Sequence, residues 1–404
     1  MKVCMLAYTE YERDNRVRRY AEALAKRGDQ VDIISLEGSH ARSGNGEVGA
    51  VKVYEIQKRD LNERGVWSYA RRQLSFLARS SALLTRLHHR NAYDLVHVHN
   101  IPDFLVFAAW YPRMTGSAII LDIHDIVPEL FANKFKSRLS KLYVGMLRTM
   151  EKASARFADH VIVSNDLWRE TLVARSVRSA DCSVFINHVD TEVFKRKTRS
   201  RRDGHFVVLF PGTFQWHQGL DIGIRAFAKF KEEVGDAEFH LYGGGNLTIE
   251  SELKELVREL RLEGAVKFCG AVSLDQMAEV MANADLGVVP KRADAFGNEA
   301  YSTKIMEFMS QGIPVVASET KIDAYYFREG VVHFFKSGDV DGMTRAMLDI
   351  ARDGNLRESL VQSGYDYVEQ NCWDVKKKEY FNLVDSLRKL HHGEAGSGLQ
   401  EGTS

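Results

Sequence analysis

Two glutamates, Glu299 and Glu307, stand around the start of a short predicted helix. Ser302 occupies the N-cap position, an apolar period runs over residues 303–311, and Gly312 ends the helix. The first turn of such a helix offers unpaired N–H groups and a positive dipole end, which suit a diphosphate. Because carboxylates accept hydrogen bonds from sugar hydroxyls, the spacing predicts a diphosphate at the helix start and a sugar on each acid. A nucleotide-sugar has that composition.

Other residues allow chemistry, but each also has a plain structural explanation. Gly243 and Gly244 follow a predicted strand and open a helix, which suits close approach to phosphate, although any tight turn favours glycine. His97 and His99 share one face of a strand end, as metal ligands could. Without a third ligand nearby they indicate a polar wall instead. The aspartates around position 340 precede an apolar helix, where capping explains them, so we expect no metal.

Several enzyme classes lack their motifs in this chain. The sequence has no G-x-x-x-x-G-K-[ST], no G-x-S-x-G and no H-E-x-x-H. The first predicted strand is followed by residues 8–11, which include no glycine, so the dinucleotide fingerprint of a dehydrogenase is missing. No residue stands out as a covalent nucleophile. We therefore expect no cofactor, with the nucleotide-sugar acting as substrate.

Short apolar runs alternate with longer amphipathic segments, which predicts an α/β fold with parallel sheets and right-handed crossovers. Strands are predicted at residues 3–7, 31–36, 95–99, 118–123, 160–164, 206–210, 238–242, 265–268, 286–289 and 315–317. Helices are predicted at residues 17–27, 68–88, 139–156, 219–232, 248–262, 275–281, 303–311 and 341–352. Each half is therefore predicted to be a doubly wound, Rossmann-like domain that collects ligands at the carboxyl ends of its strands.

The pattern is interrupted at residues 195–205, a basic stretch that we interpret as a linker. This places a first domain at 1–195 and a second domain at 205–372. The Gly/Ser-rich segment 391–404 is predicted to be a flexible tail.

Composition favours a globular protein of the cytoplasm. The 404 residues are 45% hydrophobic and 27% charged, with no apolar run long enough to span a bilayer and no secretory leader pattern. Four cysteines lie far apart, which favours a reducing compartment. Net charge is zero, yet residues 1–204 hold 34 Lys and Arg against 24 Asp and Glu, so the first half is expected to meet an anionic partner.

Several segments together resemble the retaining nucleotide-sugar glycosyltransferases of the GT-B fold, family 4. The segment from Glu299 through E-F-M-S-Q-G-I-P-V-V-A-S, which begins at Glu307, is similar to the E-x₇-E motif and its continuation. Weaker matches, in the family's order, are residues 14–28, 94–99, 186–194, 210–227, 241–246, 266–270 and 284–290. The resemblance implies two Rossmann-like domains facing a central cleft. It also implies a final helix, residues 375–390, that returns to the first domain.

The resemblance also implies roles for individual residues. Glu307 would bind the ribose hydroxyls, Glu299 would bind the donor sugar, and His124 would lie beside that sugar. Backbone groups near Ser302, Thr303 and Lys304 would hold the diphosphate, with Gly212, Thr213, Gln218, Gly243 and Gly244 completing the nucleotide-sugar site. Candidates for the first-domain side of the cleft are Asp14, Arg16, His99 and Asp125.

Two departures from the family pattern concern the diphosphate. Relatives usually carry a basic residue just after the glycine at Gly212, and a K-G pair; here Thr213 and Gln218-Gly219 stand instead. Phe296-Gly297 also precedes Glu299 rather than following it. We therefore expect Lys304 to supply the missing charge, with Lys291 and Arg292 as second choices.

The expected partners are a nucleotide-sugar, with UDP favoured over GDP, and a glycan or lipid-linked acceptor, with no nucleic acid. Two alternatives remain open: a nucleotide-sugar 2-epimerase of the same fold, and a non-catalytic nucleotide-sugar-binding subunit. Residues 64–90 and 134–156 are basic and amphipathic, with Glu151 as their only acid. They predict peripheral docking of the first domain on an anionic cytoplasmic membrane surface.

Overall fold

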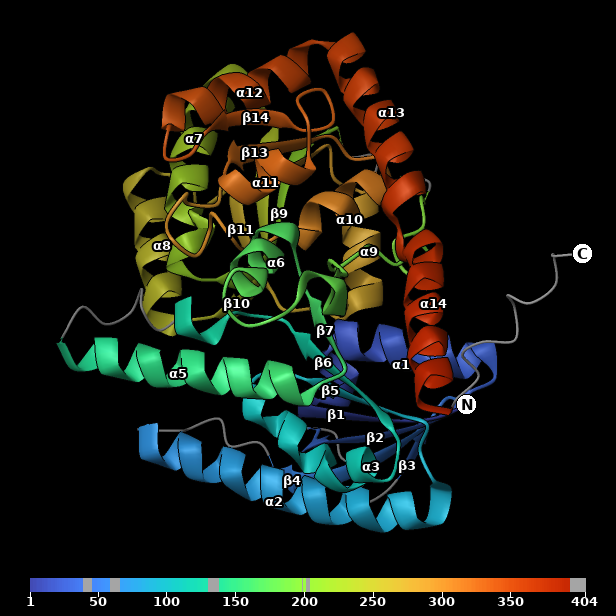
Figure 1. Cartoon of the computed structure of the whole chain (residues 1–404). Helices are drawn as coiled ribbons and strands as arrows, with labels where there is room; N and C mark the ends of the chain where they lie inside the picture. Colours follow the sequence, from blue (N-terminus) through green and yellow to red (C-terminus); the bar gives the residue numbers. More distant parts are fainter. Residues whose placement is uncertain (39–45, 59–65, 130–137, 198, 201–203, 393–404) are drawn as a thin grey trace, which may run out of the picture. The chain divides into compact units, whose positions relative to one another are not determined.

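A computed structural model describes the chain apart from residues 39–45, 59–65, 130–137, 198, 201–203 and 393–404 (Figure 1). The chain forms two compact units, one comprising Met1–Ile186 and Lys377–Ser404 and the other Asn187–Lys376. The first unit therefore ends at Ile186, earlier than residue 195, which the sequence pattern predicts as the end of the first domain.

The first unit is built on an eight-stranded sheet in the order β3-β4-β2-β1-β5-β6-β7-β8. Its strands are β1 (Lys2–Glu10), β2 (Gln30–Glu37), β3 (Gly46–Val48), β4 (Val51–Lys58), β5 (Leu95–His99), β6 (Ala118–Ile123), β7 (His160–Val163) and β8 (Cys182–Val184). All neighbours pair in parallel except β3 with β4. Every residue of β5 and β6 is buried, although each strand carries polar side chains.

Helices cover both faces of this sheet, with α1 and α2 on opposite sides (Figure 1). They are α1 (Asn15–Arg27), α2 (Val66–Asn91), α3 (Trp110–Met114), α5 (Arg138–Phe157) and α6 (Asp166–Val173). The sequence fixes the ends of α1 locally. The carboxylate of Asp14 accepts from the backbone N–H groups of Arg16 and Val17, and Gly28 ends the helix at φ +97°.

The second unit has a parallel six-stranded sheet in the order β11-β10-β9-β12-β13-β14. The strands are β9 (Phe206–Phe214), β10 (Ala237–Gly245), β11 (Val266–Gly270), β12 (Leu286–Val289), β13 (Val315–Glu319) and β14 (His333–Lys336). The helices are α7 (Leu220–Glu233), α8 (Leu247–Glu259), α9 (Leu274–Ala282), α10 (Thr303–Gln311), α11 (Lys321–Tyr326), α12 (Val340–Arg352) and α13 (Gly354–Asn371).

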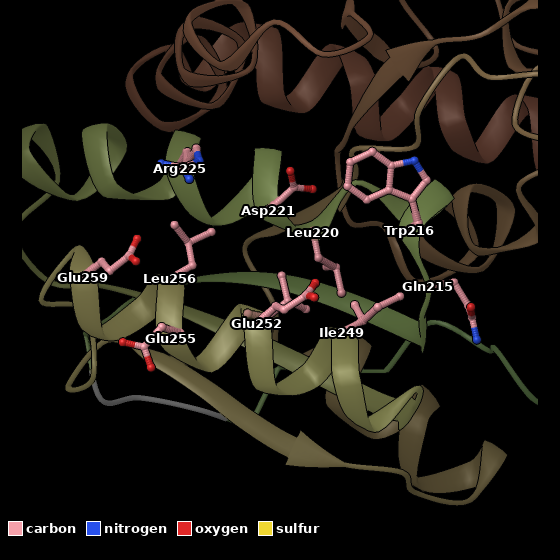
Figure 2. A pocket seen from close by; sticks show the side chains of 11 residues that line it. Gln215, Trp216, Leu220, Asp221, Arg225, Ile249, Glu252, Glu255, Leu256 and Glu259 are labelled. Carbon is pink, nitrogen blue, oxygen red and sulfur yellow. The ribbon is translucent and has the colours of Figure 1, made fainter.

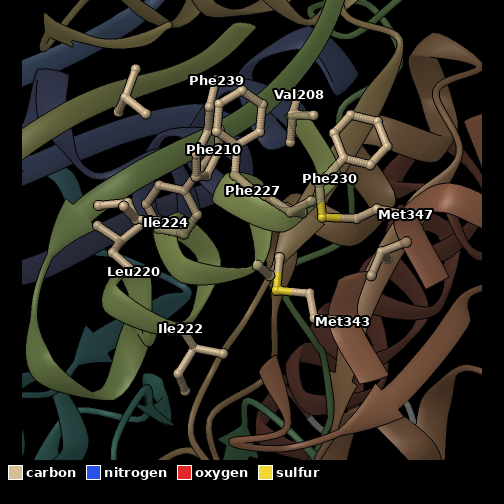
Figure 3. Close-up of a cluster of buried hydrophobic side chains, with 14 of the residues drawn as sticks. Val208, Phe210, Leu220, Ile222, Ile224, Phe227, Phe230, Phe239, Met343 and Met347 are labelled. Atoms are coloured by element: carbon tan, nitrogen blue, oxygen red, sulfur yellow. The ribbon is translucent and has the colours of Figure 1, made fainter. Parts of the chain in front are cut away.

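Apolar side chains from α7, α12 and the sheet form the core of the second unit (Figure 3). Phe227 and Phe230 of α7 are fully buried, as are Phe210 and Phe239 of the sheet. Met343 from α12 joins the same cluster. This packing fixes the carboxyl end of β9, where several of the predicted site residues lie.

The last helix, α14 (Trp373–His392), passes from the second unit into the first. Within the first unit, Tyr380 and Val384 are buried, and Asp385 accepts from the Arg27 guanidinium at 3.0 Å. The predicted return of the final helix is therefore confirmed.

The strand and helix alternation predicted both doubly wound sheets correctly, and the α/β fold class is confirmed. Four strands, β3, β4, β8 and β14, were not predicted. They lie at or next to a sheet edge, where a strand needs fewer apolar residues. The helices α3, α6, α11 and α13 were also missed.

Two boundary predictions need correction. The described part of 195–205 is not a free linker, because its basic residues pair with acids of the second unit. Lys197 lies 3.4 Å from Glu279, and the Arg199 guanidinium pairs with Asp285. The predicted tail starts later than residue 391, since α14 includes His392, and residues 393–404 lie outside the described chain.

Candidate functional site

The predicted helix α10 spans Thr303–Gln311, as expected, and ends at Gly312 with φ +74°. Ser302 holds the N-cap position, but its hydroxyl does not cap the helix. Ser302 Oγ instead donates to Asp323 Oδ2 at 3.0 Å. The start of α10 therefore has no side-chain cap, and backbone N–H groups of its first turn are left for a ligand.

Lys304 brings a cation to the group that we call the α10 cluster: Gly212, Gln218, Lys304 and the first turn of α10. Lys304 Nζ donates to Gln218 Oε1 at 2.9 Å and lies 4.2 Å from the ring centroid of Phe210. A Cβ on Gly212 would approach Lys304 Nζ to 2.8 Å. The ammonium thus lies beside Gln218 and beside Gly212, the residue before Thr213.

Burial lowers the pKa of Lys304 to about 7, even though the nearby charge of Glu307 acts in the opposite direction. Lys304 Nζ donates to a neutral amide rather than to a carboxylate, so the burial effect outweighs that of the nearby acids. An anion at the start of α10 would offset the burial effect and would raise the lysine pKa again.

The glycines of β9 and β10 allow two backbones to approach closely. Gly212 and Gly243 are register partners, and a Cβ on Gly243 would lie 1.8 Å from the Gly212 carbonyl oxygen. The sequence predicted that Gly243 and Gly244 open a helix, but in the structure they lie within β10. Asn246 caps the following helix instead, accepting from Thr248 N at 3.0 Å. Gly244 pairs with the exposed Thr213 at the end of β9.

The two second-choice cations are engaged elsewhere. Lys291 is buried, and its Nζ lies 2.8 Å from Asp323 Oδ2 and donates to the Ala300 carbonyl at 2.6 Å. It therefore holds the loop before α10 in place. Arg292 donates to Asp221 at 2.6 Å and stacks 3.7 Å from the ring centroid of Trp216. Of the three candidates, Lys304 is the one placed at the start of α10.

Glu299 and Glu307 lie in the loop before α10 and inside that helix, respectively, and both are half-buried. They flank the start of α10, at the positions that the sequence predicted for them. Each has interactions within the protein, so neither is an isolated acid.

A pocket of about 360 Å³ lies in the second unit, between α7 and α8 (Figure 2). Trp216 and Leu220 supply apolar surface, while Asp221, Glu252 and Glu255 supply negative charge. An acidic lining disfavours a diphosphate. This pocket is therefore separate in character from the α10 cluster.

The first unit gathers four polar side chains into a group that we call the His124 cluster: Arg16, His99, Asp122 and His124. Arg16 donates to Asp122 through Nε at 2.9 Å and through Nη2 at 2.7 Å. His99 Nδ1 lies 3.2 Å from Asp122 Oδ2 and 3.1 Å from His124 Nε2. Apart from the His124 ring, which is 20% exposed, the cluster is buried.

Electrostatics indicates the charge of Arg16, Asp122 and His99 and of the neighbouring His97. Although burial opposes ionisation, the Arg16 guanidinium, which donates to both carboxylate oxygens, holds the pKa of Asp122 well below its usual range. Burial lowers the pKa of His99, against the influence of Asp122. Burial and the neighbouring His99 lower the pKa of His97 further. At neutral pH the cluster therefore contains an Arg⁺–Asp⁻ pair and a neutral His99 ring, and the adjacent His97 ring is neutral as well.

His97, His99 and Asp122 also meet the geometric condition for a metal site within the described chain, because one ligand atom from each lies within 4.8 Å of the others. The sequence offered no third ligand beside His97 and His99, and the structure supplies one in Asp122. Arg16, however, occupies both oxygens of Asp122, and a divalent ion would be held against a buried guanidinium. The residues fit a hydrogen-bond network better than a metal site.

The remaining first-unit candidates have structural roles. Asp14 caps α1 and Arg16 anchors Asp122. The Asp125 backbone carbonyl accepts from Asn100 Nδ2 at 2.9 Å, and burial raises the pKa of its carboxyl. Asp122 itself was missed by sequence reasoning. Its signal is a single acid inside the otherwise apolar strand AIILDI, which demands a buried partner.

Family models match both units. The model for glycosyl transferase 4-like domains matches residues 14–188, and the model described as glycosyl transferases group 1 matches residues 190–367. The chain belongs to the group 1 glycosyltransferases. This assigns it to the transferases and confirms the resemblance seen in its motifs.

Individual relatives agree with this assignment. A phosphatidyl-myo-inositol mannosyltransferase of Mycobacterium leprae is 24% identical over 377 residues, 92% of each chain. The structure of sucrose-phosphate synthase from Thermosynechococcus elongatus has a TM-score of 0.77, at 18% identity, covering 96% of this chain and 99% of that one. Anabaena HepE in complex with UDP-glucose has a TM-score of 0.66, at 17% identity, covering 98% and 99%. These likenesses show the GT-B fold.

Proposed function

We propose that this glycosyltransferase is a retaining enzyme that uses a nucleotide diphosphate sugar and needs no metal. The observation that carries the proposal is the α10 cluster, where a half-buried lysine with a lowered pKa stands at a helix start without a side-chain cap. A helix dipole and one ammonium can together stabilise a leaving diphosphate. Glu307 would then bind the ribose and Glu299 the donor sugar.

The proposed reaction is a front-face displacement. The bond between the sugar C1 and the diphosphate oxygen breaks, and the acceptor oxygen bonds to C1 from the same face. The proton of the acceptor hydroxyl passes to the leaving phosphate oxygen. His124 would contact the donor sugar during this step, and no covalent sugar–enzyme intermediate is involved.

We favour a UDP-sugar as donor, which is supported by the structurally similar HepE, whose solved complexes contain UDP and UDP-glucose. The acceptor is proposed to be a lipid-linked or polysaccharide precursor of a cell-surface glycan. The mannosyltransferase relative, whose name specifies a phosphatidylinositol acceptor, supports a lipid-linked one.

Peripheral docking on an anionic membrane is part of the proposal. No described helix is both long and apolar enough to cross a bilayer. Basic side chains are exposed on α2 and α5, including Arg79, Arg86 and Lys152. Leu74 of α2 and Met146 of α5 are each 56% exposed. Arg64, Lys134 and Lys136 of the predicted surface lie outside the described residues.

Cosedimentation with neutral and anionic vesicles at two salt concentrations tests this docking. We expect binding to anionic vesicles that weakens with salt, since each cation near such a surface contributes about 1 kcal/mol before screening. Binding that ignores lipid charge would favour a soluble acceptor.

The central test of function is mass spectrometry of the purified chain with a panel of UDP- and GDP-sugars, with and without a membrane lipid extract. We expect one donor to release its nucleoside diphosphate and to glycosylate a lipid of the extract. Conversion of the donor to its epimer would identify a 2-epimerase. Binding of the donor without turnover would identify a nucleotide-sugar-binding subunit.

A further inference from the structure

The His124 cluster contains a triangle of three polar atoms whose proton positions can be worked out. His99 Nδ1 lies 3.2 Å from Asp122 Oδ2 and 3.1 Å from His124 Nε2. The third side, from His124 Nε2 to Asp122 Oδ2, is 3.3 Å. The first two contacts have hydrogen-bond geometry and share one atom, the Nδ1 of His99.

Asp122 determines which nitrogen of His99 carries the proton. Its carboxylate is ionised because Arg16 donates to both of its oxygens, so it can only accept hydrogen bonds. His99 Nδ1 must therefore be the donor in its contact with Asp122. In the neutral ring this leaves Nε2 of His99 without a proton. That nitrogen is buried and has no hydrogen-bond partner in the described chain, which a bare nitrogen tolerates better than an N–H does.

The proton on His99 then determines the tautomer of His124. Two ring nitrogens 3.1 Å apart can share one proton, and His99 Nδ1 already carries it. His124 Nε2 must accept. A neutral His124 ring therefore carries its own proton on Nδ1. That nitrogen has no partner among the described residues, and the ring is partly exposed.

Backbone contacts hold this ring in place. The His124 N–H donates to Asn100 Oδ1 at 2.7 Å, and the His124 carbonyl accepts from Ser164 Oγ at 3.0 Å. On the opposite side of the network, Arg16 Nη1 donates to the Phe185 carbonyl at 2.6 Å. The hydrogen-bonded row of Arg16, Asp122, His99 and His124 is thus anchored at both ends.

We propose that Asp122 and His99 are positioning residues that select, in the neutral His124 ring, the tautomer with its proton on Nδ1, so that His124 donates a hydrogen bond to an oxygen of the substrate. The fitting ligand group is an acceptor oxygen, such as a sugar hydroxyl or ring oxygen or a phosphate oxygen. His124 is then not a general base. This inference rests on the proposed function for its substrate, but the tautomer itself is a property of the free protein.

The tautomer can be measured directly in the intact chain with ¹⁵N-labelled histidine. Correlation spectra between ring nitrogens and ring carbon-bound protons distinguish a ring protonated on Nδ1 from one protonated on Nε2. The His124 signals are assigned by comparison with His124→Asn. We expect His99 and His124 both to be protonated on Nδ1, whereas a free histidine ring prefers the proton on Nε2.

Two variants test the cause. An amide at position 122 can donate to His99 Nδ1, so Asp122→Asn should move the proton of His124 to Nε2. His99→Phe removes the donor to His124 and should have the same effect while keeping the Arg16–Asp122 pair, in case Asp122→Asn does not fold. His240→Gln, which alters a histidine of the second unit paired with Glu238, is the matched control and should leave the His124 pattern unchanged.

Kinetics supply a second readout, because an asparagine amide nitrogen can replace Nδ1 and a glutamine amide nitrogen can replace Nε2. We expect His124→Asn to retain about tenfold more kcat/KM than His124→Gln, the factor that one neutral hydrogen bond commonly contributes. A His124 proton on Nε2 in the unmodified protein, or no change in either variant, would overturn the proposal. If the donor panel shows no transfer, the proposed function fails while the tautomer result still stands.

Discussion

The two units treat buried charge in opposite ways. In the His124 cluster, Arg16 and Asp122 cancel each other inside the protein, and the neutral rings pack against the pair. In the α10 cluster, Lys304 faces a neutral amide beside an uncapped helix start, and burial weakens its hold on a proton. The first arrangement is complete without ligand, whereas the second becomes complete when an anion arrives. The first therefore serves orientation and the second serves binding.

The largest expected effect breaks the completed pair. Arg16→Met leaves Asp122 buried without its counter-charge, and we expect the free energy of unfolding to fall by about 3–5 kcal/mol. Urea unfolding followed by circular dichroism measures this. The double variant Arg16→Met/Asp122→Leu should recover much of the loss, because removing both charges leaves none uncompensated.

Arg18→Met is the matched control for this variant. Arg18 pairs with Glu22 one turn along the same helix, but both side chains are more than one-third exposed. Such a pair contributes only about 0.3–0.5 kcal/mol. Equal losses for Arg16 and Arg18 would contradict the view that the Arg16–Asp122 pair organises the first unit.

The second prediction concerns binding rather than stability. Glu307→Ala should weaken nucleoside diphosphate binding by about 1.5–3 kcal/mol, the usual contribution of a hydrogen bond to a charged group. Calorimetry with the ribose and 2′-deoxyribose forms of the nucleotide locates the loss. The variant should discriminate less between the two forms than the unmodified chain does. Undiminished discrimination would remove Glu307 from the ribose.

The local features of both clusters could be predicted from sequence. Residues 303–311 showed a helical period bounded by Ser302 and Gly312, and α10 has those bounds. The strands LVHVH and AIILDI were predicted with the bounds that the structure gives them. Periodicity and capping act over a few residues, so one sequence contains enough information to recognise them.

The pairings across the fold could not be predicted. Arg16 and Asp122 are 106 residues apart, and Lys304 and Gln218 are 86 apart. Their contacts depend on strand order and on which helix covers which strand. Ser302 shows the same limit at short range: its type predicts a cap, but the buried Asp323 from α11 takes its hydroxyl. A tertiary hydrogen bond thus replaced the local one that propensity favours.

The third prediction tests whether Lys304 is the cation of the α10 cluster. Lys304→Met should weaken nucleoside diphosphate binding by about 2 kcal/mol and leave nucleoside binding almost unchanged, since the lost contact is to phosphate. Lys321→Met, in an exposed lysine at the start of α11, is the control. An equal loss for nucleoside and nucleoside diphosphate would show that Lys304 supports the fold rather than the phosphate.

The smallest effect is the pH dependence that follows from the lowered pKa of Lys304. With that pKa at about 7 in the free protein, Lys304 is mostly neutral above pH 7, and a bound anion must bring a proton with it. Nucleoside diphosphate affinity should therefore fall between pH 7 and 8.5. The affinity can fall by at most about tenfold, or 1.4 kcal/mol, per pH unit. The fall ends near the pKa of Lys304 in the complex, which the bound anion raises. Calorimetry in buffers of different ionisation enthalpy should detect proton uptake on binding.

The Lys304→Met variant should lose both the dependence of affinity on pH and the proton uptake, which separates titration of the lysine from titration of the ligand phosphate. If the variant keeps the slope of the unmodified chain, Lys304 is not the titrating group, and the contrast between a completed first cluster and an uncompensated second one fails at this residue.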